Sequence, residues 1–256
     1  SILDNPVYAN IGEAFNSWRR YVESFGFGTR LGIDLPGELA GTLPTTGLYD
    51  RVHGKNRWKS LTVISLSIGQ GEIGATPLQL AHAVATLSQR GLRFLPRVLY
   101  ATEDPGTRLK TLEPPRSAPP VVVKNSRDWE PVINGMIHVV EGGTAHRIGI
   151  GAKYRIAGKT GTAQVFTLGQ GEKYNAKQLS KNLLDHALFI AFAPVEEPRI
   201  AVAVIAEHGG GGSSTAAPLA RKVMDAWLLN RYEETAPDST AAPVAAPPEP
   251  SPHGTE

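Results

Sequence analysis

Two nearly continuous apolar runs, residues 187–193 and 200–206, restrict the fold of this 256-residue chain more than any other feature. A short connection with a proline at each end, Pro194 and Pro198, separates them. Short apolar runs bounded by turn residues are typical of strands buried on both faces. The runs therefore predict a hairpin of two strands that is covered on both sides.

Helices are predicted from apolar residues that recur at helical spacing. Their approximate ranges are residues 15–25, 76–91, 127–141 and 216–229. The second has clear end signals, because Thr76 is a good N-cap, Pro77 suits the first helical position and Gly91 closes the helix. The inward-facing residues are expected to be Phe15, Trp18, Val22 and Phe25 in the first helix, Leu80, Val84 and Leu87 in the second, Trp129, Val132, Ile133, Met136, Ile137 and Val140 in the third, and Leu219, Val223 and Trp227 in the last.

A further strand is expected over residues 154–164, with coil at 32–59 and an exposed proline-rich loop at 104–120. The order is thus helices, three strands and a final helix. This order predicts a mixed α+β fold in which helices cover an antiparallel sheet. Residues 1–232 are expected to form this unit, and the Pro/Ala-rich residues 233–256 a disordered tail.

Composition limits the function. The 26 basic and 24 acidic residues give a net charge of +2, which does not favour a nucleic-acid partner. Without cysteine there is no thiol catalysis, and the seven scattered histidines do not form a metal-binding pattern, so neither a metal nor another cofactor is expected. No run approaches the roughly 20 apolar residues of a membrane-spanning helix. A membrane anchor is expected upstream of Ser1.

Two glycine patterns resemble nucleotide-binding motifs. Residues 69–74 match GxGxxG, but the helix signals start beyond the third glycine and no acidic residue ends a second strand at the required distance. We interpret these glycines as a tight turn. Gly158-Lys159-Thr160 resembles the end of a P-loop, but Lys153 occupies the position of the first glycine and a strand follows instead of a helix.

The segment Lys159-Thr160-Gly161-Thr162 lies on the predicted strand, where it is suited to bind an anion. Alternation along the strand places Lys159 and Gly161 on one face and the two threonines on the other. Glycine removes a side chain where a ligand must approach the backbone. The plain alternative is an ordinary edge strand with a solvated lysine.

The context of this segment resembles the class B penicillin-binding proteins of the penicillin-binding protein 2 type. The matching segments, in order from about Trp18 to Leu228, are FGFG through GIDLPGE (25–38), SIGQG (67–71), ATPLQ (75–79), GTA (143–145), AGKTGTAQ (157–164) and FAP (192–194). Lys-Thr-Gly is the third motif of serine penicillin-recognising enzymes. The resemblance implies the transpeptidase fold shared with serine β-lactamases, truncated on its N-terminal side.

The resemblance also implies a peptidoglycan D,D-transpeptidase at the outer face of the cytoplasmic membrane. A serine would attack a D-Ala-D-Ala stem peptide, and β-lactams would trap the acyl-enzyme. Lys159 would supply positive charge, the Thr160 and Thr162 hydroxyls would bind the substrate carboxylate beside Gly161, and the Thr162 N–H would be an oxyanion donor. Expected partners are stem peptides, β-lactams and the membrane-embedded glycosyltransferase and elongation machinery.

The family's first two motifs are not found. No serine of the chain has a lysine three positions later, so S-x-x-K is missing. Ser180-Lys181-Asn182 matches S-x-N, but it follows the Lys159 strand where the family order requires it to precede it, and we interpret it as chance. The nucleophile is therefore unknown and expected upstream of Ser1, and the fragment alone is expected to be inactive.

Two other enzymes, a serine β-lactamase and a D,D-carboxypeptidase, share the Lys-Thr-Gly motif and are alternatives, as is a non-catalytic β-lactam sensor module. The segments GIDLPGE and SIGQG favour the transpeptidase. Two smaller features have modest interpretations. His186 is expected to make a local hydrogen bond, and residues 209–212 form a turn for which a role as a substrate loop is the alternative.

Overall fold

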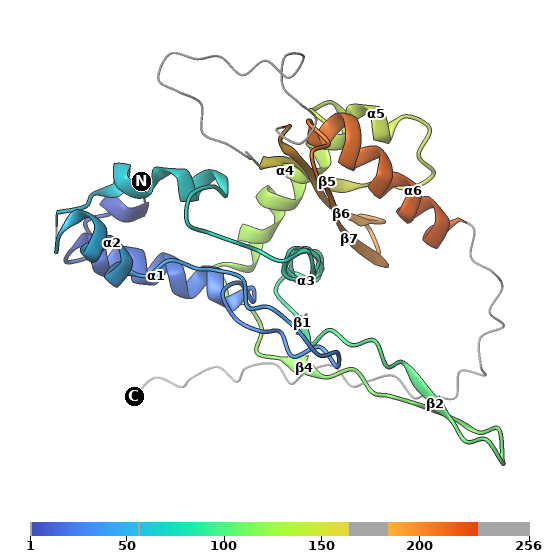
Figure 1. Ribbon diagram of the computed structural model, residues 1–256. Coiled ribbons are helices and arrows are strands. Elements are labelled where there is room, and N and C mark those ends of the chain that lie inside the picture. Colours follow the sequence, from blue (N-terminus) through green and yellow to red (C-terminus); the bar gives the residue numbers. More distant parts are fainter. Residues whose placement is uncertain (1, 56, 164–183, 230–256) are drawn as a thin grey trace, which may run out of the picture.

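The computed structural model describes residues 2–55, 57–163 and 184–229 (Figure 1). Its main sheet has three antiparallel strands in the order β5-β6-β7. They are β5 (Ala157–Ala163), β6 (His186–Ala193) and β7 (Ile200–Ala206). The predicted hairpin is confirmed, because β6 and β7 pair along their whole length from Ala187↔Ala206 to Ala193↔Ile200.

Helices lie on both faces of this sheet (Figure 1). The principal ones are α1 (Ile11–Ser24), α2 (Thr46–His53), α3 (Pro77–Ser88), α4 (Trp129–Glu141), α5 (His146–Gly149) and α6 (Ala217–Leu228). Other helical segments are the 3-10 helices η1 (Ile2–Asp4), η2 (Ser60–Ile68) and η3 (Ser126–Asp128) and the π-helix η5 (Gly212–Ala216). The mixed α+β class predicted from the order of elements is confirmed.

The two faces of the sheet belong to two apolar clusters. Alternate residues of β6, including Phe189, pack against Ala220 and Met224 of α6. The opposite face presents Phe192, which packs with Val84 of α3 and residues of α4 such as Ile133. Successive strand residues point to opposite faces, so the continuous apolar run of β6 supplies both clusters.

The helix α6 has its predicted place but not its predicted inward face. Ala217, Ala220 and Met224 are completely buried, whereas Leu219, Val223 and Trp227 are 43–51% exposed. Alanines allow the helix axis to approach the sheet closely, and this packing outweighs the larger apolar residues of the neighbouring stripe. The choice of Val132 as an inward residue of α4 is also wrong. Ile133, Met136, Ile137 and Val140 form the buried stripe at helical spacing, and Val132 lies beside this stripe and is 51% exposed.

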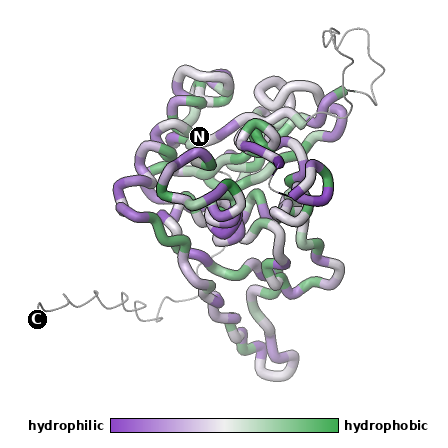
Figure 2. Tube along the Cα trace, turned by 90° about the vertical axis from the view of Figure 1, so that its left-hand side faces the viewer, coloured by the Kyte–Doolittle hydropathy of each residue, from purple (hydrophilic) through white to green (hydrophobic). Residues whose placement is uncertain are grey.

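Two segments predicted to lack regular structure contain short elements. Helix α2 lies within residues 32–59, where the Thr45 side chain caps it and Tyr49 is buried against Phe15 and Trp58. Four short strands lie within or beside the predicted loop at 104–120 and form two antiparallel pairs, β1 (Arg93–Phe94) with β4 (Ser117–Ala118) and β2 (Ala101–Glu103) with β3 (Lys110–Leu112). The β2–β3 hairpin projects from the rest of the chain and mixes hydrophilic and hydrophobic residues (Figure 2). Its strands have no buried face, so their sequence lacks the alternation that identifies a strand.

The ATPLQ segment starts α3 and also supports the loops beside it. As predicted, Thr76 is the N-cap; its side chain accepts from the Gln79 N–H, and the Gln79 side chain accepts from the Thr76 N–H. Gln79 is 1% exposed. Its Nε2 donates to the carbonyls of Gly26, Thr29 and Ala40 at 3.0, 2.9 and 2.8 Å. One buried amide therefore fixes two separate stretches of loop against α3.

The GIDLPGE segment is held by its two acidic residues. The Glu38 carboxylate accepts hydrogen bonds from the backbone N–H groups of residues 31–33. The Asp34 carboxylate accepts from the N–H groups of Val98 and Leu99 at 2.6 and 2.8 Å. These two backbone hydrogen bonds hold the pKa of Asp34 below its ordinary value. The acidic residues of this segment thus have a structural role, which is to order a loop that has no regular hydrogen-bond ladder of its own.

Candidate functional site

The predicted site residues lie on β5, at an edge of the sheet. β5 pairs antiparallel with β6, in agreement with the predicted antiparallel sheet, and no other described strand pairs with its outer edge. Lys159 and Gly161 lie opposite Ile190 and Leu188, while Thr160 and Thr162 lie opposite Phe189 and Ala187. Residues directly opposite each other share a face of the sheet. The threonines therefore lie on the α6 face and Lys159 on the face that packs against α3 and α4.

Close packing fixes the start of this strand. Gly158 is buried, and a Cβ built on it would lie 2.4 Å from the Phe189 ring. The ring therefore occupies the place of a side chain at position 158. Any larger residue at position 158 would push β5 away from β6. Gly158 therefore allows the Lys159–Thr162 segment to pair closely with β6.

The polar groups of the segment reach the surface. Lys159 and Thr162 are exposed, and Thr160 is half-buried. The Lys159 ammonium donates a hydrogen bond to the Thr160 carbonyl oxygen at 2.7 Å. An ammonium and two hydroxyls on a strand whose outer edge pairs with no other described strand are suited to bind a carboxylate by charge-assisted hydrogen bonds.

The turn at residues 209–212 lies directly against this segment. Gly212 is buried, and a Cβ on it would lie 2.4 Å from the Leu188 carbonyl oxygen and 2.5 Å from that of Gly161. The start of η5 thus rests on the backbone of β5 and β6 between the two threonines. Sequence reasoning treated the four glycines mainly as a turn; the requirement for glycine at position 212 arises from a contact with residues far away in the sequence.

A third threonine hydroxyl, from another element, lies within hydrogen-bond distance of Thr160. Thr144, in the turn between α4 and α5, places its Oγ1 3.1 Å from the Oγ1 of Thr160. Thr144 belongs to the GTA segment, which contributed to the family resemblance but was assigned no role. The GTA segment itself was the only sequence signal that could have pointed to Thr144. The sequence does not show that residues 144 and 160 lie close together in space.

Two histidines lie at the far end of the strand. His186, which pairs with Ala163, accepts a hydrogen bond at Nδ1 from the backbone N–H of His208 at 2.9 Å. Their rings form an edge-to-face pair with centroids 4.8 Å apart. A hydrogen bond was predicted for His186 and is found, but its partner lies 22 residues away rather than close by in the sequence. With Nδ1 accepting, neutral His186 carries its proton on Nε2.

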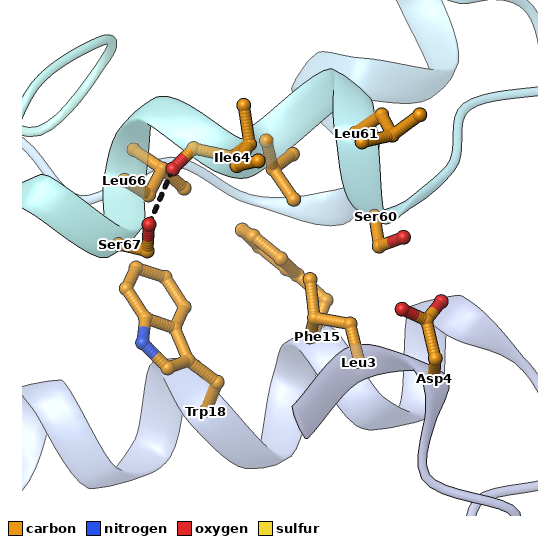
Figure 3. A pocket seen from close by; sticks show the side chains of 10 residues that line it. Leu3, Asp4, Phe15, Trp18, Ser60, Leu61, Ile64, Leu66 and Ser67 are labelled. Carbon is orange, nitrogen blue, oxygen red and sulfur yellow. Dashed lines mark hydrogen bonds between the residues drawn. The ribbon is translucent and has the colours of Figure 1, made fainter. Parts of the chain in front are cut away.

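An apolar hollow of about 410 Å³ lies elsewhere, between α1 and η2 (Figure 3). Phe15 and Trp18 of α1 face Leu61 and Ile64 of η2 across it. The hydroxyl of Ser67 on its rim donates to the Ile64 carbonyl oxygen at 2.6 Å and is thereby engaged. None of the lining residues belongs to β5, so this hollow is separate from the Lys159–Thr162 segment.

The glycines of residues 69–74 form a turn, as interpreted from the sequence. Gly69 and Gly71 have φ values of +73° and +81°, and Gly74 forms an isolated antiparallel bridge with Thr42. The described residues contain no group of three or more potential metal ligands. Helices long and apolar enough to cross a membrane are also not found in the described part of the chain. Ser180, Asn182 and residue 164 of the predicted strand lie outside the described residues, as does the predicted tail at 233–256.

The antiparallel sheet, its two helical layers and an exposed Lys-Thr-Gly-Thr edge strand define a transpeptidase domain of the penicillin-recognising type. A model of the penicillin binding protein transpeptidase domain matches residues 4–225. The chain belongs to this family, and within it to the class B proteins of the penicillin-binding protein 2 type.

Relatives and solved structures agree on this placement. The chain is 44% identical over 222 residues to the peptidoglycan D,D-transpeptidase MrdA of Acinetobacter baumannii and 37% identical over 228 residues to that of Escherichia coli, covering 86% and 88% of this chain. It spans only about a third of these relatives, 31% and 35% of their lengths. The crystal structure of Pseudomonas aeruginosa PBP2 in complex with WCK 5153 matches 85% of this chain and 45% of that chain, with a TM-score of 0.68 and 36% identity.

Proposed function

We propose that this chain supplies one wall of the active site of a peptidoglycan D,D-transpeptidase. The observation that carries the proposal is the segment Lys159–Thr162, with Lys159 and Thr162 exposed, on the edge of β5 that pairs with no other described strand. Its ammonium, hydroxyl and backbone groups suit the C-terminal carboxylate and the scissile carbonyl of a D-Ala-D-Ala stem peptide. A β-lactam carries the same two groups.

Each residue has a proposed role. The Lys159 ammonium supplies positive charge beside the nucleophile and the substrate carboxylate. The hydroxyls of Thr160 and Thr162 donate to that carboxylate. The Thr162 N–H donates to the oxyanion of the tetrahedral intermediate, a role typically worth about 2.7–4 kcal/mol in the transition state. Gly161 keeps the strand accessible to the substrate backbone.

The proposed reaction is an acyl transfer in two steps. A serine Oγ attacks the carbonyl carbon of the penultimate D-Ala, the peptide C–N bond breaks, and D-Ala leaves with the proton on its amine. The amine of a neighbouring stem peptide then attacks the ester carbonyl carbon. A new peptide C–N bond forms, the ester C–O bond breaks, and the serine oxygen takes up a proton from the amine. The chain contains no S-x-x-K sequence, so we assign the serine and its lysine to residues of a longer protein outside these 256.

We assign the whole protein to the outer face of the cytoplasmic membrane, where stem peptides are cross-linked. We also propose that it works with the elongation machinery. A relative supports this assignment: the Helicobacter pylori PBP2, 25% identical over 83% of this chain with a TM-score of 0.65, was solved as a complex with MreC. Residues 1–232 form the transpeptidase part in this proposal and residues 233–256 a separate tail.

The first test concerns the nucleophile. The 256-residue chain and the full-length protein are incubated with a fluorescent penicillin, and intact masses are measured. We expect a stoichiometric mass increase for the full-length protein and none for the chain, because no serine of the chain has a lysine one helical turn later. A stoichiometric adduct on a serine of the chain would show that the nucleophile lies within it.

The second test concerns the threonine hydroxyl and uses the full-length protein. Thr162→Val keeps the backbone N–H and the shape of the side chain but removes the hydroxyl. Acylation by a carboxylate-bearing penicillin should slow by the equivalent of about 1–2 kcal/mol, the contribution of one charge-assisted hydrogen bond. Thr111→Val, at an exposed position of β3 remote from β5, is the matched control. An unchanged rate in Thr162→Val would exclude the hydroxyl as a carboxylate ligand.

A further inference from the structure

The hydrogen bond between Thr144 and Thr160 sets the direction in which Thr160 can donate. Their Oγ1 atoms are 3.1 Å apart, and either hydroxyl can be the donor in the free protein. A hydroxyl has one proton and two acceptor lone pairs. If Thr160 donates to Thr144, it has no proton left for a substrate carboxylate. If Thr144 donates to Thr160, the Thr160 proton is available for the substrate.

The backbone holds Thr144 in place for this contact. The Ala145 N–H donates to the Val139 carbonyl at 2.9 Å, and the His146 N–H donates to the Gly143 carbonyl at 3.1 Å. Gly143 lies so close to the end of α4 that a Cβ on it would be 2.8 Å from the Cα of Val139. The turn between α4 and α5 therefore has little freedom to move Thr144 away from β5.

The residues that follow Thr144 pack in the apolar core, whereas Thr144 itself does not. Ala145 and Ile148 are 1% and 4% exposed and belong to the same apolar cluster as Phe189. Arg221 of α6 donates to the Ile148 carbonyl and ties α5 to the last helix. Thr144 is exposed, so its hydroxyl buries almost nothing and contributes little to stability. Its placement is instead explained by its contact with Thr160.

We propose that Thr144 is a positioning residue that donates to Thr160 Oγ1 and so directs the Thr160 proton to the substrate carboxylate. The inference rests on the proposed function and adds a residue to it. A hydroxyl that accepts a hydrogen bond becomes a better donor, so the pair also strengthens the contact with the carboxylate. The direction of the hydrogen bond between the two threonines is fixed only when the carboxylate is present. Loss of the Thr144 hydroxyl should therefore change substrate binding and the acylation rate.

The test measures acylation of the full-length protein by a fluorescent penicillin. Thr144→Val keeps the shape and removes the hydroxyl, and we expect acylation about three- to tenfold slower, as for the loss of one ordinary hydrogen bond. Thr144→Ser restores the hydroxyl and should restore the rate. Thr111→Val on β3 is the matched control and should leave the rate unchanged.

Two further readouts separate positioning from a structural role. In a Thr160→Val background, Thr144→Val should add no further loss, because its effect acts through the Thr160 hydroxyl. With the methyl ester of the penicillin, which has no carboxylate charge, Thr144→Val should acylate at the wild-type rate. If Thr144→Val does not fold, the comparison of Thr144→Ala with Thr144→Ser decides in its place.

The outcomes distinguish this inference from the proposed function. A wild-type protein that is not acylated refutes the proposed function and the inference together. A wild-type protein that is acylated, with Thr144→Val reacting equally fast, refutes the inference alone. Equal slowing with the acid and the ester, or full additivity with Thr160→Val, also overturns it, since Thr144 would then act independently of the carboxylate.

Discussion

Replacing Gln79 by leucine should destabilise the protein far more than an ordinary glutamine substitution. The Gln79 amide is 1% exposed and donates to the carbonyls of Gly26, Thr29 and Ala40. Leucine has a similar volume, so the variant creates little cavity or strain. The change therefore isolates the cost of removing the hydrogen bonds from the end of α3 and the loops beside it.

The magnitude follows from the burial of the three carbonyls. The bond to Gly26 is buried, and a carbonyl left without a partner there costs about 1–3 kcal/mol. The amide NH2 group has two hydrogens for three carbonyls, so the partly buried bonds to Thr29 and Ala40 together are worth about 0.5–1.5 kcal/mol. The bond that the Gln79 carbonyl oxygen accepts from the Thr76 N–H is worth about 0.5–1.5 kcal/mol as well. Gln79→Leu should therefore lower the free energy of unfolding by about 2–6 kcal/mol. The whole stability of many domains is only about 5–15 kcal/mol, so this loss is a large fraction of it.

Urea unfolding followed by far-UV circular dichroism measures the effect from the shift in the midpoint at constant slope. Gln89→Leu is the matched control, because Gln89 lies exposed just after α3. Gln79→Glu should be at least as destabilising as Gln79→Leu, since a carboxylate cannot donate to carbonyls. A loss below about 1 kcal/mol for Gln79→Leu would refute the inference that these hydrogen bonds hold the loops, because substitutions of exposed residues cause losses of that size.

Two other predictions concern glycine and acid. Gly212→Ala should destabilise the protein by about 1–3 kcal/mol, because its Cβ would lie 2.4 Å from a backbone oxygen of β6. Gly135→Ala, at a position of α4 with no neighbouring atoms, should instead stabilise the protein by about 0.5–1 kcal/mol. Equal unfolding midpoints for the two variants would contradict this prediction. The pKa of Asp34 is lowered by the N–H groups of Val98 and Leu99, so its stabilisation is present above its unfolded pKa of about 3.9 and is lost as pH falls through its folded pKa. Asp34→Asn should remove this part of the acid dependence. The stabilities of the two proteins, followed by circular dichroism in acid titrations, should therefore differ at neutral pH and converge only as pH falls below the folded pKa of Asp34; an identical pH dependence throughout would exclude the interaction.

Local sequence determined the elements with strong local signals. Thr76 and Pro77 specify the start of α3, because a side-chain cap and a fixed φ act within one turn of helix. The apolar runs of β6 and β7 likewise required a buried hairpin, whatever the rest of the fold. The segment Lys159–Thr162 could be assigned to a strand from the residues on either side of it. Each of these signals depends on neighbours within a few residues.

Tertiary structure decided which groups meet. Helix α6 carries two apolar stripes, and only packing against the sheet selects the alanine stripe with Met224 over the stripe with Trp227. The contact of Gly212 with β5, and that of Thr144 with Thr160, join residues from separate elements. No periodicity or motif spacing encodes such contacts, because they depend on the distance and angle at which whole helices and strands pack. The sequence by itself thus determined the strand that carries the candidate site, and the packing of α4 and η5 against that strand decided which other residues surround it.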